Sequence, residues 1–182
     1  MTNLAHTAAI VLAAGKGTRM KAKSKNKVAF KLHGQPMISY TVDHLQEAGI
    51  TSIITVVGYQ SDSVRAALGD KVTYAVQTDQ LGTGDALKAA IPSIPQNTNT
   101  ILTMYGDDSA FYPPSLFLDM VEKKSQLGCE ILFLTIHKKD PAGLGRIVRD
   151  SSGKVERIVE EKNATESERQ IQEINTGFYC FD

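Results

Sequence analysis

The sequence predicts an α/β fold built on a doubly wound, mostly parallel sheet. Short apolar runs rich in β-branched residues alternate with segments of helical periodicity along most of the chain. The first apolar run breaks abruptly into the small residues of Ala13–Gly15, as a buried strand does where it leaves a sheet. Such alternation is typical of parallel βαβ units with right-handed crossovers.

The predicted strands are apolar runs bounded by turn residues. The first covers residues 8–12 and the last ends near residue 181. Six of the expected strands are 8–12, 53–57, 72–76, 100–105, 130–137 and 174–181. Two further strands, 146–149 and 155–160, flank Asp150–Gly153 and indicate a hairpin.

The predicted helices carry start and stop signals. One covers residues 36–48, with a proline near its start and Gly49 after its end. The others are expected over residues 61–69, 83–91 and 113–124, the last opening on two prolines and a serine. In such a sheet, ligands bind beyond the carboxyl ends of the strands. We therefore expect the loops 13–27, 77–84 and 106–109 to converge on one crevice.

Composition excludes several classes of protein. The chain has 182 residues, which is the size of one domain, and a formal net charge of +0, which argues against generic nucleic-acid binding. We expect no membrane association, because no apolar stretch is long enough to span a bilayer, and a cytoplasmic location, because residues 1–7 lack a signal-peptide core. Cys129 and Cys180 are expected to be buried, reduced thiols.

The cationic loop Gly15–Lys27 is the strongest local indication of chemistry. Taken alone, such a run predicts a solvated surface loop; its position directly after a buried strand favours phosphate binding instead. Its spacing is not that of a Walker A loop, and Met20 stands where a dinucleotide fingerprint needs its third glycine. Asp107 follows the strand 100–105. Its residue type and position fit a metal ligand and a turn residue equally well.

Several motifs together resemble one family. Val11–Met20 (VLAAGKGTRM), Lys27 and Gly34–Met37 are similar to the signature of the sugar-1-phosphate nucleotidyltransferases. Gln77–Ala86 (QTDQLGTGDA) narrows the resemblance to the N-acetylglucosamine-1-phosphate uridyltransferases, which form the N-terminal domain of bifunctional bacterial enzymes. Four later segments follow in the family's order: Tyr105–Asp107, Gly143–Ile147, Val159–Glu160 and Gln170–Gly177. The resemblance covers the whole chain and implies one Rossmann-like, glycosyltransferase-A-like nucleotidyltransferase domain over residues 1–182.

The resemblance also implies site residues, a metal and substrates. UTP and a sugar 1-phosphate would be the substrates, and Mg²⁺ the cofactor. The uridine would be bound by Leu12, Ala13, Ala14, Gly15, Gln77, Gly82 and Thr83. The triphosphate would be held by the catalytic Arg19 and Lys27, the metal by Asp107, and the sugar phosphate by Gly145, Glu160 and Asn175. An ionised phosphate oxygen would attack the α-phosphorus in line, so no protein nucleophile is needed.

Alternatives stay open at this point. Asn26 stands where the family usually has proline, so Lys25 is a second candidate for the role of Lys27. Asp108 and Ser109 also depart from the family, and Asp108 is either a supporting acid or a surface turn residue. Relatives continue beyond Asp182 with elements that carry a second metal-binding asparagine and often a left-handed β-helix acetyltransferase domain, which we expect this chain to lack. The rival functions are cytidylyl or guanylyl transfer and a non-catalytic nucleotide-binding module.

Overall fold

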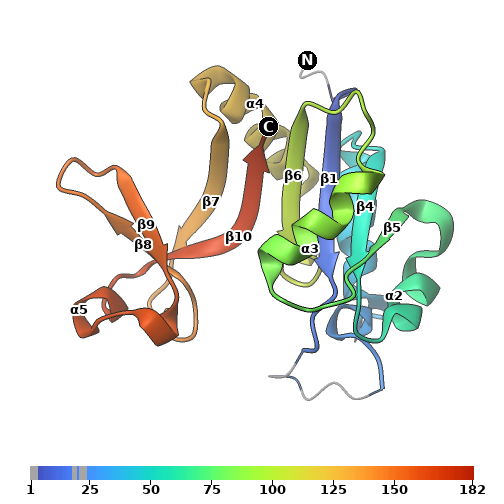
Figure 1. The fold of residues 1–182 in the computed structure, drawn as a ribbon, viewed down its shortest axis with the longest axis horizontal. Helices are drawn as coiled ribbons and strands as arrows, with labels where there is room; N and C mark the ends of the chain where they lie inside the picture. Colours follow the sequence, from blue (N-terminus) through green and yellow to red (C-terminus); the bar gives the residue numbers. More distant parts are fainter. Residues whose placement is uncertain (1–3, 18–19, 21–23) are drawn as a thin grey trace. The chain divides into compact units, whose positions relative to one another are not determined.

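The computed structural model describes residues 4–17, 20 and 24–182 (Figure 1). The chain forms two compact units. The first contains the residues up to Leu132 together with Tyr179–Asp182, and the second contains Phe133–Phe178.

The first unit is built on parallel strands. β1 (Thr7–Ala13) pairs in parallel with β4 (Ser52–Val57) on one side and with β6 (Thr100–Tyr105) on the other. β5 (Thr73–Val76) extends the sheet in parallel beyond β4. The last residues of β10 (Glu173–Phe181) run antiparallel to β6. The predicted, mostly parallel α/β sheet is therefore confirmed, with one antiparallel strand.

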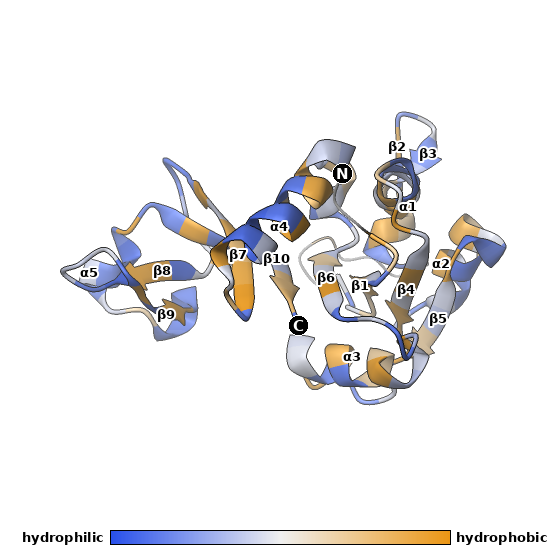
Figure 2. Ribbon diagram, turned by 90° about the horizontal axis from the view of Figure 1, so that it is seen from above, coloured by the Kyte–Doolittle hydropathy of each residue, from blue (hydrophilic) through white to orange (hydrophobic). Residues whose placement is uncertain are grey.

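Helices cover both faces of this sheet, which explains why all seven residues of β1 are buried. Figure 2 shows α3 (Thr83–Ala90) on one side of the strands and α1 (Met37–Glu47) and α4 (Pro114–Leu127) on the other. The small side chains of α3 allow it to pack closely on β1 and β4. α2 (Ser61–Leu68) packs against α1. Each of these helices lies within a few residues of its predicted range.

Short elements connect the main ones. β2 (Lys31–Leu32) and β3 (Gln35–Pro36) form a small antiparallel pair before α1. The described 3₁₀ helices are η2 (Lys27–Ala29), η3 (Gly69–Lys71), η4 (Ile91–Ser93), η5 (Asp108–Phe111) and η6 (Glu161–Asn163). These elements escaped the sequence analysis because they are too short to develop a periodic apolar pattern.

The second unit contains the predicted hairpin. β8 (Arg146–Arg149) pairs antiparallel with β9 (Val155–Val159), and the Asp150 side chain accepts hydrogen bonds from the turn. β8 also pairs with the first half of β10. β7 (Ile131–His137) enters this unit at Phe133 and pairs with β10 as well.

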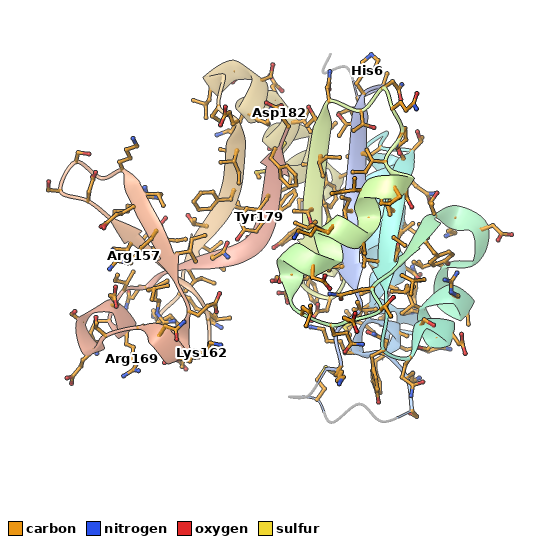
Figure 3. The ribbon with its side chains drawn as sticks, viewed as in Figure 1. His6, Arg157, Lys162, Arg169, Tyr179 and Asp182 are labelled. Carbon is orange, nitrogen blue, oxygen red and sulfur yellow. The ribbon has the colours of Figure 1, made fainter. Side chains whose placement is uncertain are left out.

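One helix of the second unit was missed. α5 (Glu166–Arg169) is only four residues long, but it opens with a capping box in which Thr165 and Glu168 bond to each other's backbone amides. The hydrogen bond from the Thr165 amide holds the pKa of Glu168 at about 2. Arg157, which Figure 3 labels on β9, pairs with the same carboxylate. The Arg157 Nη2 lies 2.5 Å from the Glu168 Oε1. The Thr-x-x-Glu spacing was the available signal for this helix.

The cysteines match the expectation in part. Both thiols are free, and Cys180 is fully buried on β10. Burial raises the pKa of the Cys180 thiol to about 11. The prediction that Cys129 is buried is wrong: it is half-buried, because it lies in the turn after Gly128 at the end of α4. Within the described ranges, no helix combines the length and the apolar character that crossing a bilayer requires.

Candidate functional site

Two of the three loops expected at the crevice, 13–27 and 77–84, line one cavity in the first unit, whereas none of residues 106–109 is among its lining. Its volume is about 390 Å³. Residues of the segments after β1 and β5, the start of α3 and the end of β6 line it. They are Leu12, Ala13, Ala14, Gly15, Lys16, Asn26, Lys27, Gln77, Gln80, Gly82, Thr83, Ala86 and Tyr105. The cavity thus contains every residue to which the resemblance gives uridine recognition.

Small residues bring the ends of three strands together at this cavity. The Tyr59 amide donates to the Ala14 carbonyl at 3.1 Å. At Gly58, a Cβ atom would lie only 3.0 Å from the Ala14 Cβ and 3.2 Å from the Gln77 carbonyl oxygen. A side chain at residue 58 would therefore push the loops after β1 and β5 apart.

Asn26 ties the cationic loop to these strand ends. Its side chain is buried, and its amide nitrogen donates to the Ala13 and Tyr59 carbonyls at 2.8 Å each and to the Gly15 carbonyl at 3.2 Å. Its amide oxygen caps η2 by accepting from the Val28 amide. Sequence reasoning noted Asn26 only as a departure from the family pattern. The Asn26 side chain thus bonds to four backbone groups, from Ala13, Gly15, Val28 and Tyr59. No local sequence pattern indicates such a set of partners.

Lys27 meets Asp107 beside the cavity. The Lys27 Nζ lies 2.7 Å from the Asp107 Oδ2. The other carboxylate oxygen, Oδ1, is buried and accepts no hydrogen bond from any residue that the structure describes. Lys25 instead lies over the ring of Phe30, 5.1 Å from its centre, and does not line the cavity. Arg19 lies outside the described residues.

The loop after Asp107 is held from within the core. The Ser109 side chain is fully buried, bonds to the Thr41 hydroxyl of α1 at 2.9 Å and donates to the Tyr105 carbonyl. Asp108, by contrast, is exposed on η5, as a surface turn residue would be. Ser109 was therefore missed as the residue that positions this loop.

Gln77 and the start of α3 form the opposite wall of the cavity. Gln77 is only 5% exposed, and its Nε2 donates to the Asp85 Oδ2 at 2.7 Å and to the Gly82 carbonyl at 3.1 Å. Gly82 precedes α3 with a φ of 118°, a conformation that glycine adopts readily. The Thr83 hydroxyl lies 3.3 Å from the Tyr105 hydroxyl, which sequence reasoning did not single out.

The second unit brings the other three candidate residues together. The Asn175 amide donates to the Gly145 carbonyl at 2.9 Å. A Cβ atom on Gly145 would lie 3.3 Å from the Glu160 Oε1 and 3.7 Å from the Asn175 Cβ. Residues 145, 160 and 175 come from three separate segments, so their proximity is a property of the fold.

A buried arginine supports this cluster. Arg146 is 1% exposed, and its guanidinium donates to the Glu161 Oε2 at 2.6 Å and to the Leu144 carbonyl. It thereby joins the segment before Gly145 to the turn that follows Glu160. Sequence reasoning missed Arg146, because a strand arginine is ordinarily exposed.

The described part of the chain contains no metal site formed by several protein ligands alone. No group of three or more His, Cys, Asp or Glu side chains there is arranged to hold a metal ion. A single carboxylate with an unsatisfied oxygen suits a different kind of site, in which Mg²⁺ is shared between the protein and substrate phosphates.

Comparisons with known proteins bear on this arrangement. The family model described as nucleotidyl transferase matches residues 8–182. The chain is 44% identical over 174 residues to the bifunctional protein GlmU of Heliobacterium modesticaldum, 43% to that of a Geobacillus species and 45% to that of Limosilactobacillus fermentum. Each match covers 96% of this chain but 38% of the relative. The chain therefore spans less than half the length of the curated relatives that it matches.

A solved structure shares the fold. A Bacillus anthracis protein assigned as a glucose-1-phosphate thymidylyltransferase superimposes with a TM-score of 0.76. The match covers 97% of this chain and 71% of that one, at 23% sequence identity. At this identity the likeness concerns the fold alone.

Proposed function

This chain belongs to the nucleotidyl transferase family, and we propose that it transfers a uridylyl group from UTP to a sugar 1-phosphate. N-acetylglucosamine 1-phosphate is the proposed acceptor, and residues 1–182 are the proposed nucleotidyltransferase domain. The observation that carries the proposal is the cavity in which Gln77, the α3 start and Lys27 line one space beside Asp107. The relatives named GlmU support the choice of this subfamily.

The residues of the cavity suit a nucleoside triphosphate. Leu12–Gly15 present backbone groups and little side chain, which leaves room for a planar base. Gln77, Gly82 and Thr83 supply polar groups for the base and the ribose. Lys27 supplies a cation for the phosphates, and we assign the same role to Arg19. Cations that neutralise the phosphate oxygens stabilise the charge that builds up during transfer.

Asp107 fits a shared Mg²⁺ ion. Its Oδ1 is buried without a hydrogen-bond partner among the described residues, a costly state for a carboxylate oxygen that a cation would relieve. Mg²⁺ typically takes one or two carboxylates and fills its other positions with phosphate oxygens and water. When bound, the ion would neutralise charge on the phosphates. Asp107 would hold it, and Lys27 would then be free to turn to the triphosphate.

The second unit supplies polar groups for the sugar phosphate. Gly145 lacks a side chain beside the Glu160 carboxylate, and Asn175 adds an amide next to both. Carboxylate and amide groups bind sugar hydroxyls well, since each hydroxyl both donates and accepts. We propose that these three residues bind the amino sugar.

The reaction needs no nucleophile from the protein. A phosphate oxygen of the sugar 1-phosphate forms a bond to the α-phosphorus of UTP, and the bond between the α-phosphorus and the bridging oxygen of the β-phosphate breaks. The electron pair of that bond leaves with pyrophosphate. The chain's residues orient the two substrates and neutralise charge, and orientation alone accounts for a large part of such rate gains.

Pyrophosphate release tests the proposal. The chain is incubated with UTP, Mg²⁺ and either N-acetylglucosamine 1-phosphate or glucose 1-phosphate, and parallel reactions contain CTP or GTP. Release with UTP and N-acetylglucosamine 1-phosphate, exceeding all other pairs, is the expected result. Turnover with CTP or GTP alone would replace uridylyl transfer by one of the rival reactions. Binding of UTP without any turnover would identify a nucleotide-binding module, and absence of UTP binding would overturn the proposal.

A further inference from the structure

We propose that Asp85 determines which pyrimidine base the cavity accepts, because it fixes the orientation of the Gln77 amide. The inference rests on the proposed function, since it concerns the same cavity. Asp85 lies in the first turn of α3, and Gln77 directly follows β5. Asp85 itself is not among the residues that line the cavity, so it would act through Gln77.

The contacts of Gln77 allow one orientation of its amide. Its Nε2 lies 2.7 Å from the Asp85 Oδ2 and 3.1 Å from the Gly82 carbonyl oxygen. A carboxylate and a backbone carbonyl only accept hydrogen bonds, so the group that faces them must be the donor. Turning the amide over would place its oxygen against two other oxygens. The two N–H groups of Gln77 are therefore both committed.

The oxygen of the same amide is the atom left for a ligand. Among the residues that the structure describes, none donates a hydrogen bond to the Gln77 Oε1. The side chain is 5% exposed and the backbone amide donates to the Val57 carbonyl at 2.8 Å, so the residue is held at both ends. Gln77 lines the cavity and thus offers its ligand an acceptor only.

An acceptor-only group discriminates between pyrimidines at ring atom N3. Uracil and thymine carry a hydrogen at N3, whereas cytosine has a lone pair there. A fixed Oε1 facing N3 therefore attracts uracil and repels cytosine. Without Asp85, only the Gly82 carbonyl still favours this orientation, so the amide can rotate about its last side-chain bond at a lower cost and offer Nε2 to cytosine. A hydrogen-bonding site that cannot adapt discriminates more strongly than one that can.

The experiment compares nucleotide affinities of the whole chain. Dissociation constants for UTP, dTTP and CTP are measured by titration calorimetry for the wild type and for Asp85→Ala and Asp85→Asn. Asp79→Ala is the matched control, because Asp79 is an exposed acid in the loop between Gln77 and α3, and no described residue donates a hydrogen bond to its carboxylate. Thermal unfolding of each variant establishes that it is folded, and the near-isosteric Asp85→Asn protects the test against a misfolded Asp85→Ala.

The expected result is a change in selectivity. The ratio of the CTP to the UTP dissociation constant falls about fivefold in Asp85→Ala, the effect of one net hydrogen bond. It also falls in Asp85→Asn, since asparagine can accept from or donate to Gln77. The dTTP to UTP ratio stays unchanged, and Asp79→Ala changes neither ratio.

Two outcomes would overturn the inference. The first is that folded variants keep the wild-type ratio of the CTP to the UTP dissociation constant, whether or not both constants rise by the same factor; a common rise indicates a merely structural role. The second is that the wild type binds CTP as tightly as UTP, which would show that Gln77 does not discriminate between bases by a hydrogen bond at ring atom N3. Failure of the proposed function is a distinct result, in which the wild type binds none of the three nucleotides.

Discussion

The Lys27 Nζ lies 2.7 Å from the Asp107 Oδ2, a contact that joins η2 to the end of β6 across 80 positions of the sequence. The two oxygens of Asp107 differ in their surroundings. Oδ2 has the lysine, while Oδ1 is buried and accepts no hydrogen bond from the described residues. The cation that we propose for the triphosphate and the carboxylate that we propose for the metal are therefore already adjacent.

Replacing Asp107 by asparagine should remove nearly all metal-dependent turnover and leave the fold intact. Asparagine has nearly the same shape and can still accept from Lys27, but it lacks the charge that holds Mg²⁺. We expect pyrophosphate release to fall about a hundredfold, as the loss of several kcal/mol of charge stabilisation implies. Asp108→Asn, on the exposed neighbour, should retain wild-type turnover. Unchanged activity in Asp107→Asn would remove Asp107 from the metal site.

The two lysines of the cationic loop should differ in function. Lys27 lines the cavity, whereas Lys25 lies over Phe30. Lys27→Ala should raise the UTP dissociation constant about tenfold or more, the contribution of a charge-assisted hydrogen bond to phosphate. Lys25→Ala should leave it unchanged. Calorimetric titration with UTP decides between them, and the reverse pattern would transfer the phosphate role to Lys25.

Asn26→Asp should destabilise the protein although it changes almost no volume. The substituted side chain would turn oxygens toward the Ala13 and Tyr59 carbonyls, which now accept hydrogen bonds from the amide nitrogen at 2.8 Å. Loss of these buried bonds is expected to lower the free energy of unfolding by about 2 kcal/mol. Urea denaturation measures the change, with Asn97→Asp, at an exposed asparagine, as the control. An Asn26→Asp midpoint equal to that of the control would contradict the assigned hydrogen bonds.

Glu173 should make stability depend on pH in the acid range. The hydrogen bond from Arg149, with a further one from Thr135, lowers the pKa of Glu173 to about 2 from an ordinary value of 4.5. Because the folded state favours the carboxylate, its stabilisation is complete above about pH 4.5 and is lost as the pH falls toward 2.

Unfolding free energies measured between pH 6 and pH 2 test this linkage. Glu173→Gln should be less stable than the wild type at pH 6, and the difference should shrink as the pH falls through the window. Glu47→Gln, at an exposed glutamate on α1, should run parallel to the wild type. A constant difference between Glu173→Gln and the wild type would show that Glu173 does not titrate as its contacts require.

Much of the fold could be predicted from the sequence because its signals are local. The strands β1, β4 and β6 are apolar runs, and α4 begins at Pro114, within the predicted Pro-Pro-Ser start, although it ends at Leu127 rather than near residue 124. Each of these depends on neighbouring residues only. The four-residue α5 and the buried Arg146 were missed, since the first is too short for periodicity and the second is buried only through its partners.

The candidate site also has features that local sequence predicts and features that depend on the fold. The residues at the strand ends and the motifs that resemble the nucleotidyltransferases could be predicted, because each is a set of residues that adjoin along the chain. The fold was needed to establish that Lys27 rather than Lys25 faces Asp107, that Asn26 joins three carbonyls, and that Asp85 commits the Gln77 amide. Most of these partners lie eight to 80 positions apart. Hydrogen bonds act over about 3 Å, so the choice among several chemically equivalent partners is made by the packing of the chain.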